Sequence, residues 1–168
     1  IAEVRVSPLD LPLTEPFETS LGTQTAAKNV AVAIETEDGT VGYGEGSPIA
    51  PVTGETQAAA VETARATADL LEGSDLADHR ARISELRETF PGAVSATQAV
   101  ETALLDVYCR VRDIPLSALF GGDPAPVETD ITIPIVDPDE AGDIARDAAD
   151  RGFGHLKIKT GNDVADDV

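Results

Sequence analysis

The chain has 168 residues, of which 42% are hydrophobic and 26% charged, and its 31 acidic against 12 basic residues give a formal charge of -19. This charge argues against a nucleic-acid partner or an anionic membrane surface, because both would repel the chain. The composition is that of a soluble globular protein, without the roughly 18-residue apolar run that a membrane span requires.

The counts of cysteine, methionine and charged residues also indicate where in the cell the protein works. The single cysteine, Cys109, cannot form an internal disulfide, so we expect a cytoplasmic location and a small core residue at this position. The absence of methionine predicts that further residues precede Ile1. The acidic, lysine-poor composition favours adaptation to a salt-rich cytoplasm, where salt screens the repulsion between carboxylates. An acidic mesophilic protein is the alternative.

The first fifty residues predict antiparallel strands. Residues 2–13 alternate loosely between apolar and polar, and residues 30–34 and 40–43 flank Asp38-Gly39, a dipeptide typical of hairpin turns. Between these strands, residues 14–27 have no clear period. We expect them to form a long loop with a function of its own.

Three helices are expected next, over residues 55–72, 75–89 and 96–112. The third has the clearest pattern, since its apolar residues recur at helical spacing on one face. Ser95 with Gln98 has the spacing of a capping box at its start.

Beyond Pro115, which is expected to end the third helix, strands and helices alternate. A strand is predicted over residues 127–135, a helix capped by Asp137 over residues 138–151, and a second strand over residues 155–159. Such a βαβ unit predicts parallel strands.

The change of pattern predicts two domains, an α+β domain of antiparallel sheet and helices over residues 1–124 and the start of a parallel α/β domain over residues 125–168. Two parallel strands with bare edges do not form a stable domain, and a closed eight-stranded barrel needs about 250 residues. We therefore expect the second domain to be incomplete. Asn162 is predicted to cap its next helix.

Lys157 and Lys159 lie two residues apart on the second of these strands. Alternate strand residues share a face, so both lysines should point one way while Leu156 and Ile158 point towards covering helices. At roughly 3.3 Å per residue their Cα atoms are about 6.6 Å apart. Two ammonium groups at that distance repel by about 2.5 kcal/mol at an effective dielectric near 20, which favours the neutral, base form of one lysine. A solvent-facing pair at a strand end is the alternative.

Four stretches in register along the chain resemble the muconate-lactonizing subgroup of the enolase superfamily. They are Gly42-Tyr43-Gly44-Glu45-Gly46-Ser47-Pro48, the helix from Ala99 to Leu119-Phe120-Gly121-Gly122, Glu128-Thr129-Asp130-Ile131-Thr132-Ile133, and Gly152-Phe153-Gly154-His155-Leu156-Lys157-Ile158-Lys159-Thr160-Gly161. The resemblance implies an α+β capping domain followed by the first βαβ of a truncated (β/α) barrel of the TIM type.

The same resemblance implies a chemistry for the two lysines. Lys159 resembles the acid/base that exchanges the proton on a carbon next to a carboxylate, and Lys157 resembles its electrostatic neighbour. The resemblance also implies Mg²⁺, which stabilises the enolate as a Lewis acid. Its three acidic ligands belong on the third, fourth and fifth barrel strands and an opposite lysine on the sixth, so we expect no metal ligands in this chain.

Within the subgroup the nearest resemblance is to dipeptide epimerases of the L-Ala-D/L-Glu type. It implies substrate contacts from Thr132, Phe17 and Val52. Gly22 stands where epimerases selective for an acidic second residue can carry an arginine, so a different dipeptide, or pairing from elsewhere, is expected.

Two alternatives remain open. The first is a muconate cycloisomerase or an o-succinylbenzoate synthase, which use the same lysine pair on other acids. The second is a catalytically inactive fragment that serves as a folding or oligomerisation module. The expected partners are a small carboxylate or dipeptide and, at most, further copies of the same chain.

Four other polar residues are expected to be structural. Glu45 should close its hairpin, His155 should be hydrogen-bonded at the start of its strand, and Asp106 should make a packing or capping contact. His79 lies in a charged helix and is expected to face solvent.

Overall fold

The computed structural model describes residues 1–19, 22–122 and 125–161. Its elements, in chain order, are β1 (Glu3–Thr19), β2 (Gly22–Glu35), β3 (Val41–Gly46), α1 (Ala50–Thr53), α2 (Gln57–Ala66), α3 (Ala68–Leu71), the 3-10 helix η1 (Leu76–Asp78), α4 (His79–Thr89), α5 (Val94–Val111), α6 (Leu116–Leu119), β4 (Asp130–Ile133), α7 (Pro138–Asp150) and β5 (His155–Ile158). They form two compact units, Ile1–Leu11 with Ala27–Pro124 and Pro12–Ala26 with Ala125–Val168.

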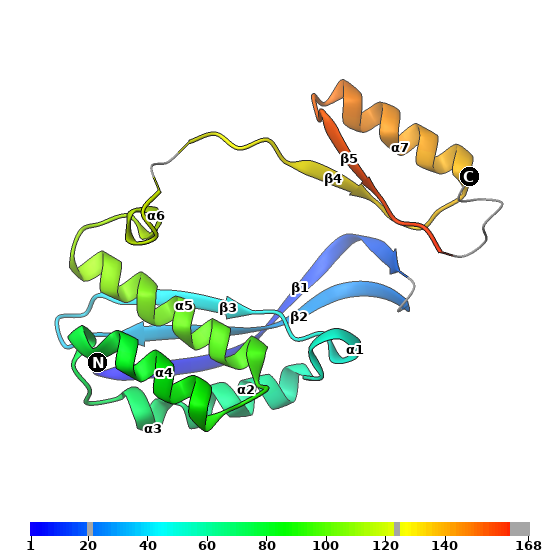
Figure 1. The fold of residues 1–168 in the computed structure, drawn as a ribbon. Coiled ribbons are helices and arrows are strands. Elements are labelled where there is room, and N and C mark those ends of the chain that lie inside the picture. The colour runs from blue at the N-terminus through cyan, green and yellow to red at the C-terminus, as the bar shows by residue number, and fades with distance from the viewer. Residues whose placement is uncertain (20–21, 123–124, 162–168) are drawn as a thin grey trace. The chain divides into compact units, whose positions relative to one another are not determined.

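The first unit contains a three-stranded sheet in the order β1-β2-β3. Helices cover one face of this sheet (Figure 1). β2 and β3 are antiparallel around the predicted Asp38-Gly39 turn. The core consists of side chains from β2, among them Val30, Val32 and Ile34, and from α2, α3, η1, α4 and α5. These results confirm an α+β domain of antiparallel sheet and helices.

The close approach of α5 to β3 depends on glycine. Gly42, Gly44 and Gly46 pair with Ile34, Val32 and Val30 and share their face, towards α5. A Cβ at Gly44 would lie 2.0 Å from the backbone oxygen of Ala99, and a Cβ at Gly46 would lie 2.1 Å from that of Ser95. The alternating glycines therefore let the helix backbone lie directly on the strand.

Cys109 is a core residue, as predicted. Its side chain is buried, and this burial raises the pKa of the thiol, with the nearby charge of Asp106 adding to the effect. A buried thiol with a raised pKa is inert rather than nucleophilic.

The predicted capping box of α5 is wrong. The helix begins at Val94, so Ser95 lies inside its first turn, and the Ala93 cap makes no side-chain hydrogen bond. The carboxylate of Glu55, 8% exposed, instead accepts from the N–H groups of Ser95 at 2.7 Å and Ala96 at 3.4 Å. A buried anion at the positive end of the helix supplies the cap from a distant segment.

We expect Glu55→Ala to destabilise the protein by about 2 kcal/mol, because it leaves buried N–H groups at the start of α5 without an acceptor. Urea unfolding measures this free energy. Glu62→Ala is the matched control, since Glu62 is exposed and makes only a surface ion pair with Arg65, which contributes at most about 0.5 kcal/mol. Equal effects of the two substitutions would contradict the capping role of Glu55.

The expected helices exist, with different bounds. The one predicted over residues 55–72 is divided at Thr67, whose hydroxyl donates to the Ala64 carbonyl at 2.6 Å. The one predicted over residues 75–89 starts with the 3-10 turn η1. α5 ends at Val111 rather than at Pro115, because Asp113 has a φ of +52°, and Pro115 instead precedes α6.

The prediction that His79 faces solvent is wrong. The residue is 5% exposed, and its ring packs against the Tyr108 ring with centroids 3.9 Å apart and the planes tilted by 39°. The guanidinium of Arg112 also lies on the Tyr108 ring, at 3.7 Å. The charged residues of α4 predict a surface helix and therefore a His79 that faces solvent. The ring of this first residue instead lies against Tyr108 of α5 and is buried there.

The predicted loop over residues 14–27 is also wrong, because its described residues, 14–19 and 22–27, belong to the two strands β1 and β2. β1 continues to Thr19 and β2 starts at Gly22. Period-two alternation appears only where one face of a strand is buried. Residues 11–16 and 22–25 are exposed on both faces, so the sequence there carries no such period.

The second unit contains the predicted βαβ. β4 and β5 are parallel neighbours, and α7 connects them, beginning after Asp137, whose side chain accepts from the Asp139 N–H at 3.0 Å. The predicted parallel pairing and the Asp137 cap are confirmed. β4 is shorter than expected, because the ladder with β5 covers only residues 130–133. Asn162, the predicted cap of a further helix, lies outside the described residues.

Candidate functional site

The two predicted catalytic lysines lie at the carboxyl end of β5. Lys157 is the register partner of Thr132 on β4, and residues paired in a parallel sheet point to the same face. Lys159 follows the strand directly and extends the ladder, since its N–H donates to the Ile133 carbonyl at 3.0 Å. By alternation Lys157, Lys159 and Thr132 share one face of the sheet.

Helix α7 covers the opposite face of β4. Ile133 and Ile135 are 1% and 9% exposed, and Ala148 of α7 is buried with them. Leu156 and Ile158 point to the same side but remain 39% and 62% exposed, so the prediction that helices cover them is not met. The physical reason is that α7 packs against β4, while β5 forms the edge of the sheet in the described part of the chain.

His155 begins β5 on the lysine face, at the opposite end from Lys159. Its Nδ1 lies 3.5 Å from a carboxylate oxygen of Glu128, and both side chains are exposed. Ligands and reacting groups in parallel α/β folds gather at the carboxyl ends of the strands. The position of His155 therefore agrees with a structural role rather than a catalytic one.

A cavity of about 720 Å³ in the second unit brings together two of the predicted substrate contacts. Phe17 of β1 and Thr132 of β4 both line it. Gln24 of β2, which sequence reasoning missed, lines it as well, and no periodicity marked this residue. The remaining lining is mixed. β1 contributes Thr14 and Glu15 beside apolar residues such as Leu13, and the α7 side contributes Asp143, Asp147 and Arg151.

The other predicted site residues lie elsewhere. Gly22 starts β2 with a φ of +119°, a conformation that L side chains rarely adopt. Val52 lies on α1 in the first unit, where its side chain is 66% exposed. Neither residue lines the cavity beside Phe17, and neither do Lys157 and Lys159.

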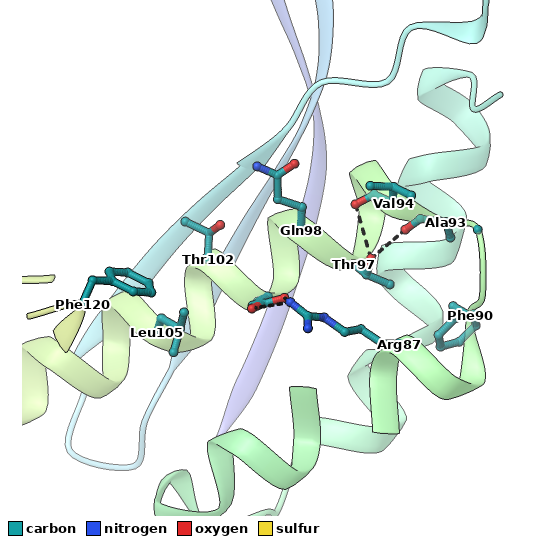
Figure 2. A pocket seen from close by; sticks show the side chains of 11 residues that line it. Arg87, Phe90, Ala93, Val94, Thr97, Gln98, Thr102, Leu105 and Phe120 are labelled. Atoms are coloured by element: carbon teal, nitrogen blue, oxygen red, sulfur yellow. Dashed lines mark hydrogen bonds and ion pairs between the residues drawn. The ribbon is translucent and has the colours of Figure 1, made fainter. Parts of the chain in front are cut away.

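A second cavity, of about 550 Å³, lies in the first unit between the end of α4, α5 and Phe120 (Figure 2). Its charged lining residues, Arg87 and Glu101, bond to each other at 2.6 and 2.9 Å. Thr97 turns its hydroxyl back to the carbonyls of Ala93 and Val94 (Figure 2). The polar groups here are thus largely engaged within the protein, and the lining offers no acid/base pair.

Two other polar side chains have structural partners, as expected. Glu45 accepts from Asn29 Nδ2 at 2.5 Å. Asp106 accepts from the Tyr43 N–H at 2.8 Å, which covers a donor on β3, and from Arg110 Nε at 2.8 Å.

Residues 1–19, 22–122 and 125–161 contain no group of three or more His, Cys, Asp or Glu side chains that could hold a metal ion. In the same residues we find no helix with the length and apolarity needed to traverse a bilayer.

A family model described as the N-terminal domain of mandelate racemase / muconate lactonizing enzyme matches residues 1–121. The chain belongs to this family. The resemblance of its motifs to the enolase superfamily is thereby confirmed.

Among members of this family, the L-Ala-D/L-amino acid epimerase of Populus trichocarpa is 38% identical over 164 residues, which are 96% of this chain and 39% of the relative. Two solved structures superpose with TM-scores of 0.94 at 34% identity, each covering 99% of this chain and 47% of the other. They are a dipeptide epimerase from Enterococcus faecalis V583 complexed with Mg and the dipeptide L-Leu-L-Tyr, and a substrate-liganded L-Ala-D/L-Glu epimerase from Bacillus subtilis. The chain spans less than half the length of these relatives.

Proposed function

We propose that the protein containing this chain is a dipeptide epimerase, which inverts the α-carbon of one residue by removing and returning its proton. The observation that carries the proposal is the shared face of Lys157, Lys159 and Thr132 at the carboxyl end of β5. The relatives that are similar to nearly the whole chain include epimerases. One of them was solved with Mg and a dipeptide, and another with its substrate.

In this proposal Lys159 is the general base. A proton next to a carboxylate is too weakly acidic for a lysine unless the negative charge of the enolate is stabilised. Lys157, on the same face, contributes a positive charge for that purpose, and Thr132 contributes a hydroxyl beside it. Phe17 would cover the substrate and exclude water from the reacting carbon.

Mg²⁺ would supply Lewis-acid stabilisation of the carboxylate when bound. We place its ligands, and the lysine that serves the opposite face of the substrate, on barrel strands that follow the βαβ unit. The division into a capping domain over residues 1–124 and a barrel start from residue 125 is part of the same proposal. For this reason we expect the 168-residue chain alone to be inactive.

A single substitution at Gln24 tests whether the cavity beside Phe17 binds the side chain of the dipeptide. Gly22 is unsuited to an added arginine, because its φ of +119° strains any L side chain, whereas Gln24 lines the cavity with Phe17 and Thr132. In the full-length protein we expect Gln24→Arg to raise kcat/KM for L-Ala-L-Glu relative to L-Ala-L-Leu by about tenfold, the effect of one charge-assisted contact of about 1.4 kcal/mol.

The matched control is Gln98→Arg, which adds the same charge on α5, at the second cavity. It should leave the ratio of the two kcat/KM values unchanged. If Gln24→Arg also leaves the ratio unchanged, the cavity beside Phe17 does not hold the side chain of the substrate. Activity on muconate or on o-succinylbenzoate precursors, without activity on dipeptides, would favour the alternative enzymes of the family.

A further inference from the structure

The long hairpin contributes residues to both compact units, and each of its strands passes once from the residues of the first unit to those of the second. On β1 the passage lies between Leu11 and Pro12, and on β2 between Ala26 and Ala27. The outer part of the hairpin, residues 12–19 and 22–26, is here called the arm. The arm carries the cavity-lining residues Phe17 and Gln24. The base of the arm is thus formed by the residues that directly precede Pro12 on β1 and directly follow Ala26 on β2.

Gln57, the first residue of α2, is bonded to both strands near this passage. Its Nε2 donates to Oδ1 of Asp10 on β1 at 2.7 Å and to the backbone carbonyl of Asn29 on β2 at 2.9 Å. Its side chain is not needed to begin α2, because Thr56 caps that helix by accepting from the Ala59 N–H at 3.2 Å. One amide group thus joins both strands of the hairpin to the helical layer.

Lys28 adds a cross-strand contact at the same level. Its Nζ lies 2.5 Å from Oδ2 of Asp10, and this hydrogen bond, followed by that from Gln57, lowers the pKa of the Asp10 carboxyl. Both carboxylate oxygens of Asp10 therefore accept a hydrogen bond, at a surface where the Lys28 and Asp10 side chains are about half exposed. The chain has three lysines, two of them the proposed catalytic pair, and the third lies at the base of the arm.

Asn29 completes the network from the buried side. It is 6% exposed, and its Nδ2 donates to Oε1 of Glu45 at 2.5 Å, while its Oδ1 is buried without a partner among the described residues. The Asn29 side chain thereby ties β2 to β3, while its backbone carbonyl accepts from Gln57. Buried polar networks impose one geometry on the strands that they join.

We propose that Asp10, Lys28, Asn29 and Gln57 form a clamp that holds β1 and β2 to each other and to α2 at the base of the arm, and so keeps the arm ordered. Gln57 is its central positioning residue, and it acts on the substrate through Phe17 and Gln24 of the arm. The kinetic part of this inference rests on the proposed epimerase function, whereas the part that concerns the order of the arm does not.

Amide hydrogen exchange of the arm in the full-length protein tests the clamp without any substrate. Gln57→Leu keeps a side chain of similar size and removes both hydrogen bonds. We expect exchange in the arm to rise by about tenfold, while exchange in α5 and the melting temperature stay close to wild type. Gln98→Leu, the same substitution on the exposed face of α5, should leave exchange in the arm unchanged.

Steady-state kinetics on a dipeptide then separates positioning from chemistry. We expect Gln57→Leu to raise KM about fivefold with kcat within about twofold, because ordering the arm then draws on binding energy. Gln57→Glu should act similarly, since it places a carboxylate against Asp10. The double substitution Gln57→Glu with Asp10→Asn reverses donor and acceptor and so restores the bond between residues 10 and 57, but not the one to the Asn29 carbonyl. It should therefore reverse part of the rise in KM.

Exchange in the arm of Gln57→Leu that equals wild type would overturn the clamp, as would an equal rise with Gln98→Leu. A general loss of protection across α5 together with the arm would show a structural role only, and would also overturn it. If the wild-type protein has no activity on dipeptides, the proposed function fails while the exchange experiment still decides the clamp.

Discussion

Lys159→Ala in the full-length protein should lower the rate of dipeptide epimerisation by about a thousandfold, the size of effect that a positioned general base contributes. The loss should be specific to one face of the substrate. In deuterated water the epimer whose α-proton faces β5 should no longer exchange that proton. The other epimer should still exchange, because the lysine proposed on a later strand removes its proton without Lys159. Proton NMR of the α-position follows both reactions separately.

Lys157→Met provides the comparison within the same strand. Lys157 shares the face of Lys159 and pairs in register with Thr132, but we assign it a charge-stabilising role, so both exchange reactions should slow without either being lost. Near-wild-type epimerisation by Lys159→Ala would show that the general-base assignment is wrong. Equal loss of both exchange reactions in Lys159→Ala would instead show that the substitution damages the site as a whole.

Gly44→Ala should destabilise the first unit by at least about 3 kcal/mol, at or beyond the upper end of ordinary overpacking. The added Cβ would lie 2.0 Å from the Ala99 oxygen and 2.6 Å from the Ala103 nitrogen. Both are backbone atoms of α5, which cannot turn aside as a side chain could. The helix must therefore move away from β3 and open the core that it shares with β2. Chemical unfolding monitored by circular dichroism measures the change.

Gly122→Ala is the control for this substitution in the same unit. A Cβ there would meet only the Ser117 oxygen, at an ordinary 3.6 Å, and Gly122 has no left-handed φ. Its stability should stay within about 0.5 kcal/mol of wild type. A Gly44→Ala protein as stable as the Gly122→Ala protein would contradict the close backbone packing of α5 on β3.

The parts of the fold that the sequence predicts are those whose pattern is local. The Asp38-Gly39 turn, the apolar stripe of α5 and the Asp137 cap each depend on residues within a few positions of one another, and each is found in the structure. The arm could not be predicted, because strands exposed on both faces have no alternation. The Glu55 cap of α5 joins residues 40 positions apart, so local spacing pointed instead to Ser95 and Gln98.

The candidate site shows the same division. Strand alternation alone places Lys157 and Lys159 on one face, and the parallel register adds Thr132 to it. Gln24 and Gln57 carry no local signal, since one lies in the exposed arm and the other reaches Asp10 across 47 positions. The exposure of Leu156 and Ile158 could not be predicted either, because it depends on which strand α7 covers.

The most direct measurement of the central claim is deuterium exchange at the α-carbon of dipeptides by the full-length wild-type protein in the presence of Mg²⁺. Dipeptides with acidic, apolar, aromatic and cationic second residues are incubated in deuterated water and followed by mass spectrometry and proton NMR. We expect at least one of them to gain a single deuterium at its α-carbon and to accumulate as both epimers. A folded, Mg²⁺-loaded protein that exchanges no α-proton in any of these dipeptides would contradict it.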